Sequence, residues 1–174
     1  MERRNFVKAT GIVFLPFLGI LTVSLISACN KFDGMDPGRA FFLRLVRYND
    51  QLIQDLIEKQ NTEEASFFFG AIPDNYTIYH PGGASTFIYR LLSGYFIEES
   101  RYYGNAELIG PCTKAARYLE KVQYEDGTFD LLTTNFMSPP DTAFMMETVC
   151  VVLNVIGKTR DPLLRTPGLL ELEE

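Results

Sequence analysis

Apolar side chains recur at intervals of three and four residues over most of the chain after residue 36. This spacing places them along one stripe of an α-helix. Four segments show it: from Pro37 to at least Ile57, from Ala84 to Glu99, from about Pro111 to Gln123, and from Pro139 to Ile156. Asn49 interrupts the first stripe, and we expect it either to bond a backbone group in the core or to face a site. The pattern predicts an all-α fold.

The third and fourth segments differ in how far their apolar surface extends around the helix. The third has charged residues on the sides away from its apolar stripe and predicts a helix that faces water. The fourth contains "AFMMETVCVVLNVI" and is apolar almost all round, which is typical of a helix enclosed by other elements. We therefore expect 139–156 to be the inner helix of the fold.

The segment from Ser66 to Pro81, "SFFFGAIPDNYTIYHP", does not follow the helical period. Its runs at 67–69 and 76–79 favour β structure, so it predicts either a short hairpin or an aromatic loop folded over the helix ends. The tail after Gly157 contains two prolines and mixed charge, and it predicts an irregular end.

The N-terminal 28 residues have the basic start, apolar stretch and small residues of an export signal. Within them, Arg3-Arg4-Asn5-Phe6-Val7-Lys8 resembles the bacterial twin-arginine translocation motif, and Ile26-Ser27-Ala28-Cys29 resembles a lipobox. The resemblance implies export, cleavage before Cys29 and a lipid anchor on that cysteine. The alternative is an uncleaved membrane-spanning helix, because the apolar stretch 9–26 is 18 residues long.

This interpretation divides the chain into a signal peptide at 1–28, a lipidated tether at 29–36 and a helical domain at 37–174. We expect the protein to be exported and held at a membrane, in the periplasm or at the cell surface. Removing residues 1–28 takes away three of the 16 basic and one of the 22 acidic residues, and leaves 146 residues with a formal charge of −8. So acidic a domain excludes a nucleic-acid partner, which requires a basic face.

Few residues point to a metal or a cofactor. No Cys/His cluster has metal-ligand spacing. The "GKT" at 157–159 lacks the earlier glycine that a phosphate loop needs, so we expect neither a metal nor a cofactor. Cys112 and Cys150 could pair in an oxidising compartment, but both lie in apolar helical patterns, where buried free thiols are common.

The connection between the third and fourth helices, "DGTFDLLTTNFMSPPDTAF", is unusually rich in specific side chains. Ser138 followed by two prolines and Asp141 is typical of a capped helix start, because an acid there meets the positive end of the macrodipole. Capping does not require Asp130, Asn135 or the neighbouring Phe129. We therefore expect this loop to line a site.

The succession of "YLEKVQYEDGTFD", "LLTTNFMSPPDTAF" and an apolar helix resembles one hairpin of the (α/α) toroids of glycoside hydrolases and polysaccharide lyases, such as heparinase-II/III-like lyases and six-hairpin glycosidases. The resemblance implies a sugar-binding funnel near Asn135, Asp141 and Glu147. A toroid of about a dozen helices needs on the order of 200 residues, so we expect an incomplete one of about two hairpins. The chain is then either the N-terminal part of a larger enzyme or a small lipoprotein without catalysis.

The candidate chemistry follows from the residue types. Hydrolysis commonly uses two carboxyls, for which Asp141 and Glu147 are candidates, and a lyase needs a base such as His80. Asp130, Asn135 and Tyr79 are candidates for substrate binding. A structural role for His80 and a solvent-facing position for Glu147 stay open.

Two functions are consistent with these candidates. The first is a polysaccharide-degrading enzyme, or part of one, whose substrates are acidic or complex polysaccharides or oligosaccharides. The second is a non-catalytic surface lipoprotein that binds a glycan or a protein partner through the loops 66–81 and 125–141.

Overall fold

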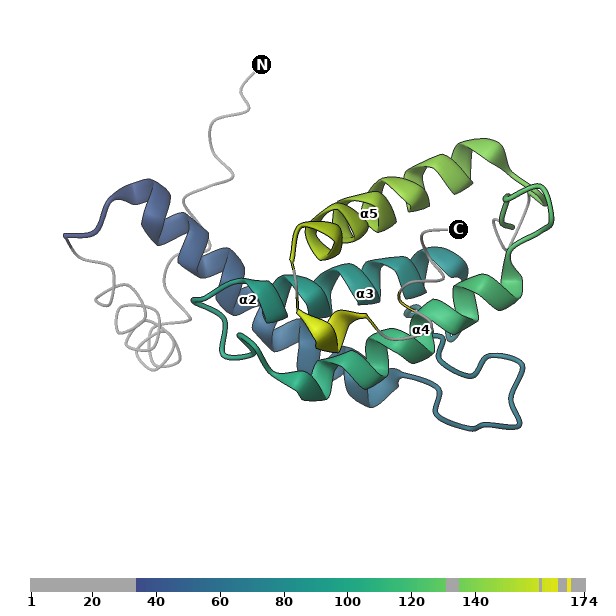
Figure 1. Cartoon of the computed structure of the whole chain (residues 1–174), viewed down its shortest axis with the longest axis horizontal. Coiled ribbons are helices and arrows are strands. Elements are labelled where there is room, and N and C mark those ends of the chain that lie inside the picture. The colour runs from purple at the N-terminus through teal and green to yellow at the C-terminus, as the bar shows by residue number, and fades with distance from the viewer. Residues whose placement is uncertain (1–33, 131–134, 160, 166–168, 170–174) are drawn as a thin grey trace, which may run out of the picture. The chain divides into compact units, whose positions relative to one another are not determined.

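The computed structural model describes residues 34–130, 135–159, 161–165 and 169. The predictions for Arg3, Arg4 and Cys29 lie outside these residues. The described helices are α2 (Pro37–Lys59), α3 (Pro81–Phe96), α4 (Ile109–Val122) and α5 (Pro139–Lys158), with short 3₁₀ turns at Ala106–Leu108 and Pro162–Leu164 (Figure 1). The described part of the chain has no strand beyond an isolated bridge between Pro73 and Tyr79. The all-α prediction is confirmed, and the segment 66–80 is a loop that ends where α3 begins.

The chain divides into two compact units, residues 1–42 and 43–174. In the described end of the first unit, the backbone N–H of Arg39 donates to the Asp36 carboxylate over 2.9 Å and so satisfies a donor at the start of α2. The candidate site lies entirely in the second unit, which the following paragraphs describe.

The most buried helix is α3, which lies between α4 and α5 (Figure 1). Both of its sides are apolar, and its buried residues include Phe87, Ile88, Leu91 and Leu92. It begins three residues earlier than predicted, because His80 caps it and Pro81 suits its first turn. It ends at Phe96 rather than Glu99. This helix is the inner one.

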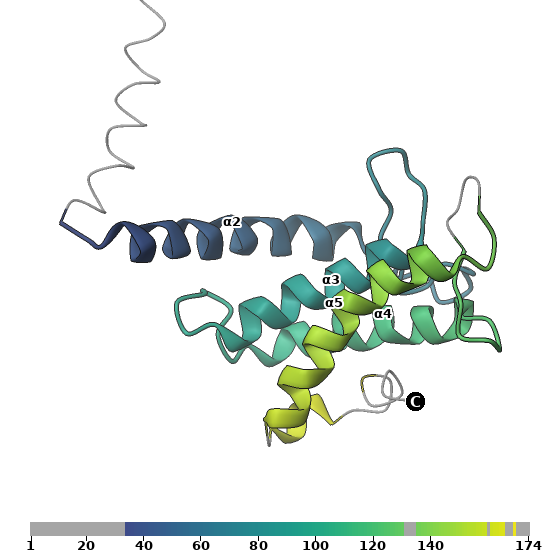
Figure 2. The ribbon, with the colours of Figure 1, turned by 90° about the horizontal axis from the view of Figure 1, so that it is seen from above.

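The prediction that α5 is enclosed was wrong. The helix packs against α3 along one side (Figure 2). Only Met145, Val149, Val152 and Ile156 are buried, whereas Phe144 is 75% exposed. The helix α5 has apolar residues on all sides, as a buried helix does, but the described residues cover only one side of it. By length and composition alone, α5 is also apolar enough to cross a membrane.

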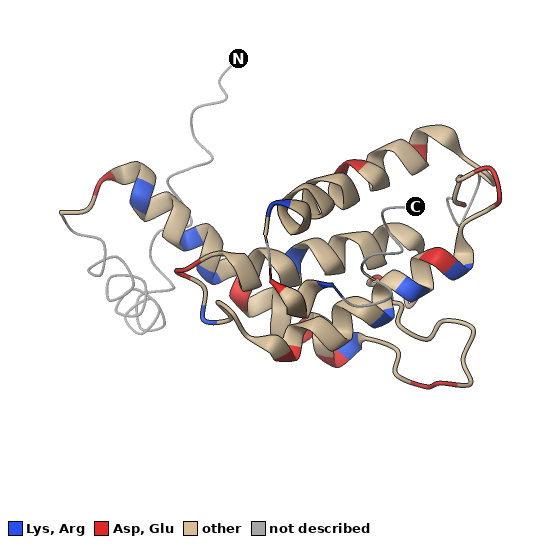
Figure 3. Ribbon diagram, viewed as in Figure 1, with Lys and Arg blue, Asp and Glu red and all other residues tan. Residues whose placement is uncertain are grey.

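The helix α4 carries charged residues, as predicted (Figure 3). Arg117, Glu120 and Lys121 are exposed, and the opposite side is buried: Cys112, Ala115, Ala116 and Leu119. Both remaining cysteines are free thiols. Cys112 is buried as expected, but Cys150 is exposed because it lies on the uncovered side of α5.

Two side chains fix the second half of α2 in place. The Asn49 amide donates to the backbone carbonyl of Arg90 over 3.0 Å, which confirms the expected backbone partner. The buried Gln60 amide, just after the helix, donates to the carbonyls of Gly70 and Pro111, each over 2.9 Å. Gln60 thereby ties the aromatic loop 66–81 to the start of α4, and this positions the loop beside the candidate site.

Candidate functional site

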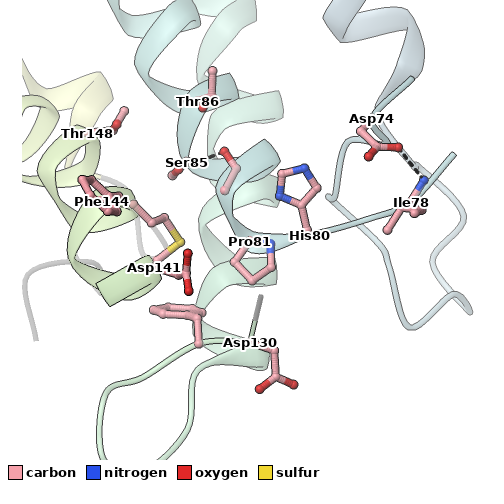
Figure 4. Close-up of a pocket in the computed structure, with 13 residues that line it drawn as sticks. Asp74, Ile78, His80, Pro81, Ser85, Thr86, Asp130, Asp141, Phe144 and Thr148 are labelled. Carbon is pink, nitrogen blue, oxygen red and sulfur yellow. Dashed lines mark hydrogen bonds between the residues drawn. The ribbon is translucent and has the colours of Figure 1, made fainter. Parts of the chain in front are cut away.

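The N-terminal ends of α3 and α5 meet at a cavity of about 390 Å³ (Figure 4). The loop 66–81 and the connection 123–138 supply the rest of its wall. The lining residues combine carboxylates, hydroxyls, an imidazole and apolar side chains: Asp74, Ile78, His80, Pro81, Gly82, Ser85, Thr86, Phe129, Asp130, Asp141, Phe144, Met145 and Thr148. Both unusual loops of the sequence therefore contribute to one cavity.

Three of the six candidate residues, His80, Asp130 and Asp141, line this cavity. Tyr79 lines a second cavity of about 280 Å³, which Asp130 also borders. Asn135 and Glu147 line neither cavity, and both side chains are exposed. Glu147 lies on the uncovered side of α5, so the solvent-facing alternative describes its position.

His80 is the N-cap of α3. Its Nδ1 accepts a hydrogen bond of 3.1 Å from the backbone N–H of Gly83. Because an accepting ring nitrogen carries no proton, the neutral imidazole has its proton on Nε2. Nε2 is then a hydrogen-bond donor, and removing a proton from a substrate would require a change of tautomer or of this cap.

Asp141 belongs to the cap of α5. Ser138 is 1% exposed, and its Oγ accepts the backbone N–H of Asp141 and donates to Oδ2 of the same residue. The predicted capping role of Ser138 and Asp141 is confirmed. The other carboxylate oxygen of Asp141 accepts no hydrogen bond from the described residues, so a ligand could bind it in the cavity (Figure 4).

Asn135 supports the same cap. Its side-chain amide donates to Ser138 Oγ over 3.0 Å. The Ser138 hydroxyl thus connects Asn135 to Asp141, which makes Asn135 a residue that positions the loop rather than one that borders the cavity.

The described part of the connection between α4 and α5 is held by its own hydrogen bonds. The backbone of Phe129 donates to Thr142 Oγ1 over 2.9 Å and accepts from the N–H of Ser138 over 3.0 Å. Asp130 accepts from the N–H of Met137 on one oxygen and from the Tyr124 hydroxyl on the other, each over 2.9 Å. These bonds fix Asp130 at the cavity wall.

No pattern in the sequence marked four other residues of the cavity wall as functional: Asp74, Ser85, Thr86 and Thr148. Asp74 lies in "PDNY", a turn pattern, and its Oδ1 does accept the N–H groups of Tyr76 and Ile78. The three hydroxyl residues sit on predicted helices with no distinguishing spacing. Only the packing of α3 against α5 brings them to one cavity.

The electrostatic character of the cavity is acidic. Asp74, Asp130 and Asp141 line it, and no lysine or arginine does. The hydrogen bond to Asp130 raises the pKa of the Tyr124 hydroxyl, which helps to keep that hydroxyl a donor to the carboxylate. Within the described residues, no set of three or more His, Cys, Asp and Glu side chains is arranged to hold a metal ion.

Comparisons with known proteins give no match: no family model, curated protein or solved structure is significantly similar to this chain.

Proposed function

We propose that this protein is an exported, lipid-anchored binding protein that holds a neutral saccharide in the cavity between the N-terminal ends of α3 and α5. The observation that supports the proposal is the convergence of the loops 66–81 and 125–141 on that one cavity. Each loop does more than connect two helices, because each supplies several side chains to the cavity wall.

The chemistry of the cavity favours a neutral polyhydroxylated ligand. The carboxylates of Asp74, Asp130 and Asp141 accept hydrogen bonds, and sugar hydroxyl groups donate them. The exposed ring of Phe144 offers apolar surface to the C–H face of a sugar, and the buried Phe129 supports the cavity wall. An acidic sugar is disfavoured, because the wall has no Lys or Arg to balance its carboxylate. This argues against the acidic glycans and the lyase chemistry that the sequence left open.

Glycoside hydrolysis is the second candidate, and one observation favours it: Asp130 and Asp141 line the same cavity. Hydrolysis requires two carboxyls on either side of the scissile bond, one as acid and the other as base or nucleophile. Glu147 would not take part, because it lies outside the cavity. Binding is preferred, because the described residues cover α5 on one side only and form at most an open part of such a ring.

The incomplete toroid also belongs to this proposal. The helices α4 and α5 do not pack against each other as one hairpin, because α3 lies between them, so α3 would pair with each of them in such a ring, and the ring would continue past α5. The exposed Phe144 and Val151 support this assignment, because further hairpins would cover them.

The lipid anchor rests on the sequence motifs at Arg3, Arg4 and Cys29. Expression in a bacterium with labelled palmitate tests it. The full chain should take up label and sediment with membranes. Cys29→Ser should do neither, and labelling of that variant would contradict the anchor. Arg3→Lys with Arg4→Lys should block export if the twin-arginine route is used.

Binding is tested with the full chain solubilised in a polyoxyethylene detergent, which contains no sugar. A panel of neutral, uronate-containing and amine-containing oligosaccharides is titrated by calorimetry. We expect binding of a neutral member that is lost in Asp141→Ala and retained in Glu147→Ala, the matched carboxylate outside the cavity. Binding of only uronates, of only simple amines, or of nothing would overturn the proposal.

A further inference from the structure

A second cavity of about 280 Å³ adjoins the first and shares two wall residues with it, Pro81 and Asp130. Its chemistry differs, because five aromatic side chains dominate the wall: Phe67, Phe68, Tyr79, Tyr118 and Tyr124. The first cavity is therefore rich in acceptor groups and the second is rich in ring faces.

The aromatic wall is organised before any ligand binds. The rings of Phe68 and Tyr79 stack with centroids 4.7 Å apart and planes at 15°, and Phe67 meets Phe68 edge-on at 5.3 Å. Lys121 lies over the Phe67 ring at 4.3 Å and donates to the Phe67 carbonyl over 3.0 Å. Lys121 is the one cation of this wall, and it already interacts with Phe67. The second cavity, like the first, therefore does not favour an acidic ligand.

Asp130 stands at the junction of the two cavities. One of its oxygens accepts from the Tyr124 hydroxyl, which belongs to the second cavity, and the other accepts from the backbone of Met137. The consecutive residues Tyr79 and His80 divide in the same way, since Tyr79 lines the second cavity and His80 the first. A ligand that passes Asp130 would meet both walls.

The volumes support a shared occupant. Cavities that bury small ligands commonly hold about 300–1,000 Å³. The volume of the second cavity, about 280 Å³, lies just below that range. The combined volume of this cavity and the first, which has about 390 Å³, lies well inside the range.

Resting on the saccharide-binding function proposed above, we propose that the two cavities are adjoining subsites for consecutive units of one neutral oligosaccharide. The unit in the first cavity donates its hydroxyl groups to Asp130 and Asp141. The next unit stacks on the exposed ring of Tyr124, which is 40% accessible, at the mouth of the second cavity. The protein therefore selects a chain of at least two sugars over a single sugar.

The test compares mono-, di- and trisaccharides of glucose and of N-acetylglucosamine on the full chain in a polyoxyethylene detergent, by calorimetry. A disaccharide should bind about three- to tenfold more tightly than its monosaccharide, the factor expected for one added stacking contact. Tyr124→Ala should remove this gain. Tyr124→Phe, which keeps the ring, should retain most of the gain. Because both Tyr124 variants lose the hydrogen bond to Asp130, the measured quantity is the ratio of disaccharide to monosaccharide affinity within each variant. Tyr103→Ala is the control, because Tyr103 is exposed and lines neither cavity.

Two results overturn the inference in distinguishable ways. Equal affinity for mono- and disaccharides, or a Tyr124→Ala variant that weakens both by the same factor, overturns the second subsite and leaves the proposed function standing. Absence of binding by every saccharide overturns both. Circular dichroism melting of each variant establishes that it is folded, which the exposure of Tyr124 leads us to expect.

Discussion

The imidazole Nδ1 of His80 accepts the backbone N–H of Gly83 over 3.1 Å, so the histidine at the wall of the cavity is also the residue that starts α3. Stability and ligand binding are coupled at this position. A variant that removes the imidazole changes both, and the two effects have to be separated by the choice of replacement.

His80→Ala should lower the free energy of unfolding by about 1 kcal/mol, because an N-cap acceptor is lost. His80→Asn should cost less than about half of that, since asparagine is a preferred N-cap. Urea unfolding measures both values. Both variants also remove the Nε2 donor from the wall of the cavity, so both should bind saccharide more weakly. An alanine variant as stable as the unmodified protein would contradict the capping role.

Gly70 should tolerate no side chain. Its φ is +88°, and a Cβ there would lie 2.1 Å from the backbone carbonyl oxygen of Lys114, an atom fixed within α4. Gly70→Ala should therefore cost about 3 kcal/mol or more. Gly104→Ala is the matched control, because Gly104 also has a positive φ, of 64°, but no atom lies within 4 Å of its Cβ position. It should cost only about 1 kcal/mol. Equal costs in thermal unfolding would show that the contact with α4 is absent.

The two thiols of the described helices should differ sharply in reactivity. Cys150 is exposed and should react with maleimide in the native protein within minutes. Cys112 is buried, and burial raises the pKa of its thiol, so it should react only after unfolding. Peptide mapping by mass spectrometry locates the label and keeps Cys29 apart from both. Labelling of Cys112 in the folded protein would contradict the packing of α4.

The hydroxyl of Tyr95 donates to the Asp161 carboxylate, and this bond, followed by burial and the carboxylate charge, raises the pKa of Tyr95 to about 12. A pKa raised in the folded state means that folding favours the protonated phenol. The resulting stability is fully present below about pH 10, the usual tyrosine value, and is lost as the pH rises through 12. Tyr95→Phe should be less stable by about 1 kcal/mol below pH 10, with the difference shrinking between pH 10 and 12.

Urea unfolding of both proteins at pH 8, 10 and 11.5 measures that difference. Tyr118, whose burial raises its pKa to about 12, is present in both and cancels from the comparison. A difference that grows with pH would have the wrong sign for this hydrogen bond.

The helical period located all four described helices, and the start of α5 was correct to the residue because Ser138 and the following prolines carry a local capping signal. The start of α3 was missed, because Gly82 and Gly83 suggest a turn whereas the cap comes from a histidine, an uncommon N-cap. Whether an apolar helix is enclosed depends on how many partners pack around it. The composition of a helix does not reveal how many partners pack around it. For this reason α5 was predicted to be the inner helix, although α3 is the inner one.

The candidate site was predictable in part. Asp130 stood out because neither a turn nor a cap requires it, whereas Asp141 was a candidate through the family resemblance, although capping alone accounts for it. Thr86 and Thr148 did not stand out, because a threonine on a helix has no local signature of function. These threonines become neighbours only through tertiary packing, which brings the N-terminal ends of α3 and α5 together.

The most direct test of the central claim is an NMR titration of ¹⁵N-labelled full chain, in polyoxyethylene detergent, with the neutral disaccharide that binds best. We predict that amide shifts concentrate at 82–86, 129–130 and 141–148, where the loops and the two helix starts border the cavity. Amides in the middle of α2 should not move. Shifts confined to α2 or to the uncovered side of α5, or no shifts at saturating sugar, would contradict the account.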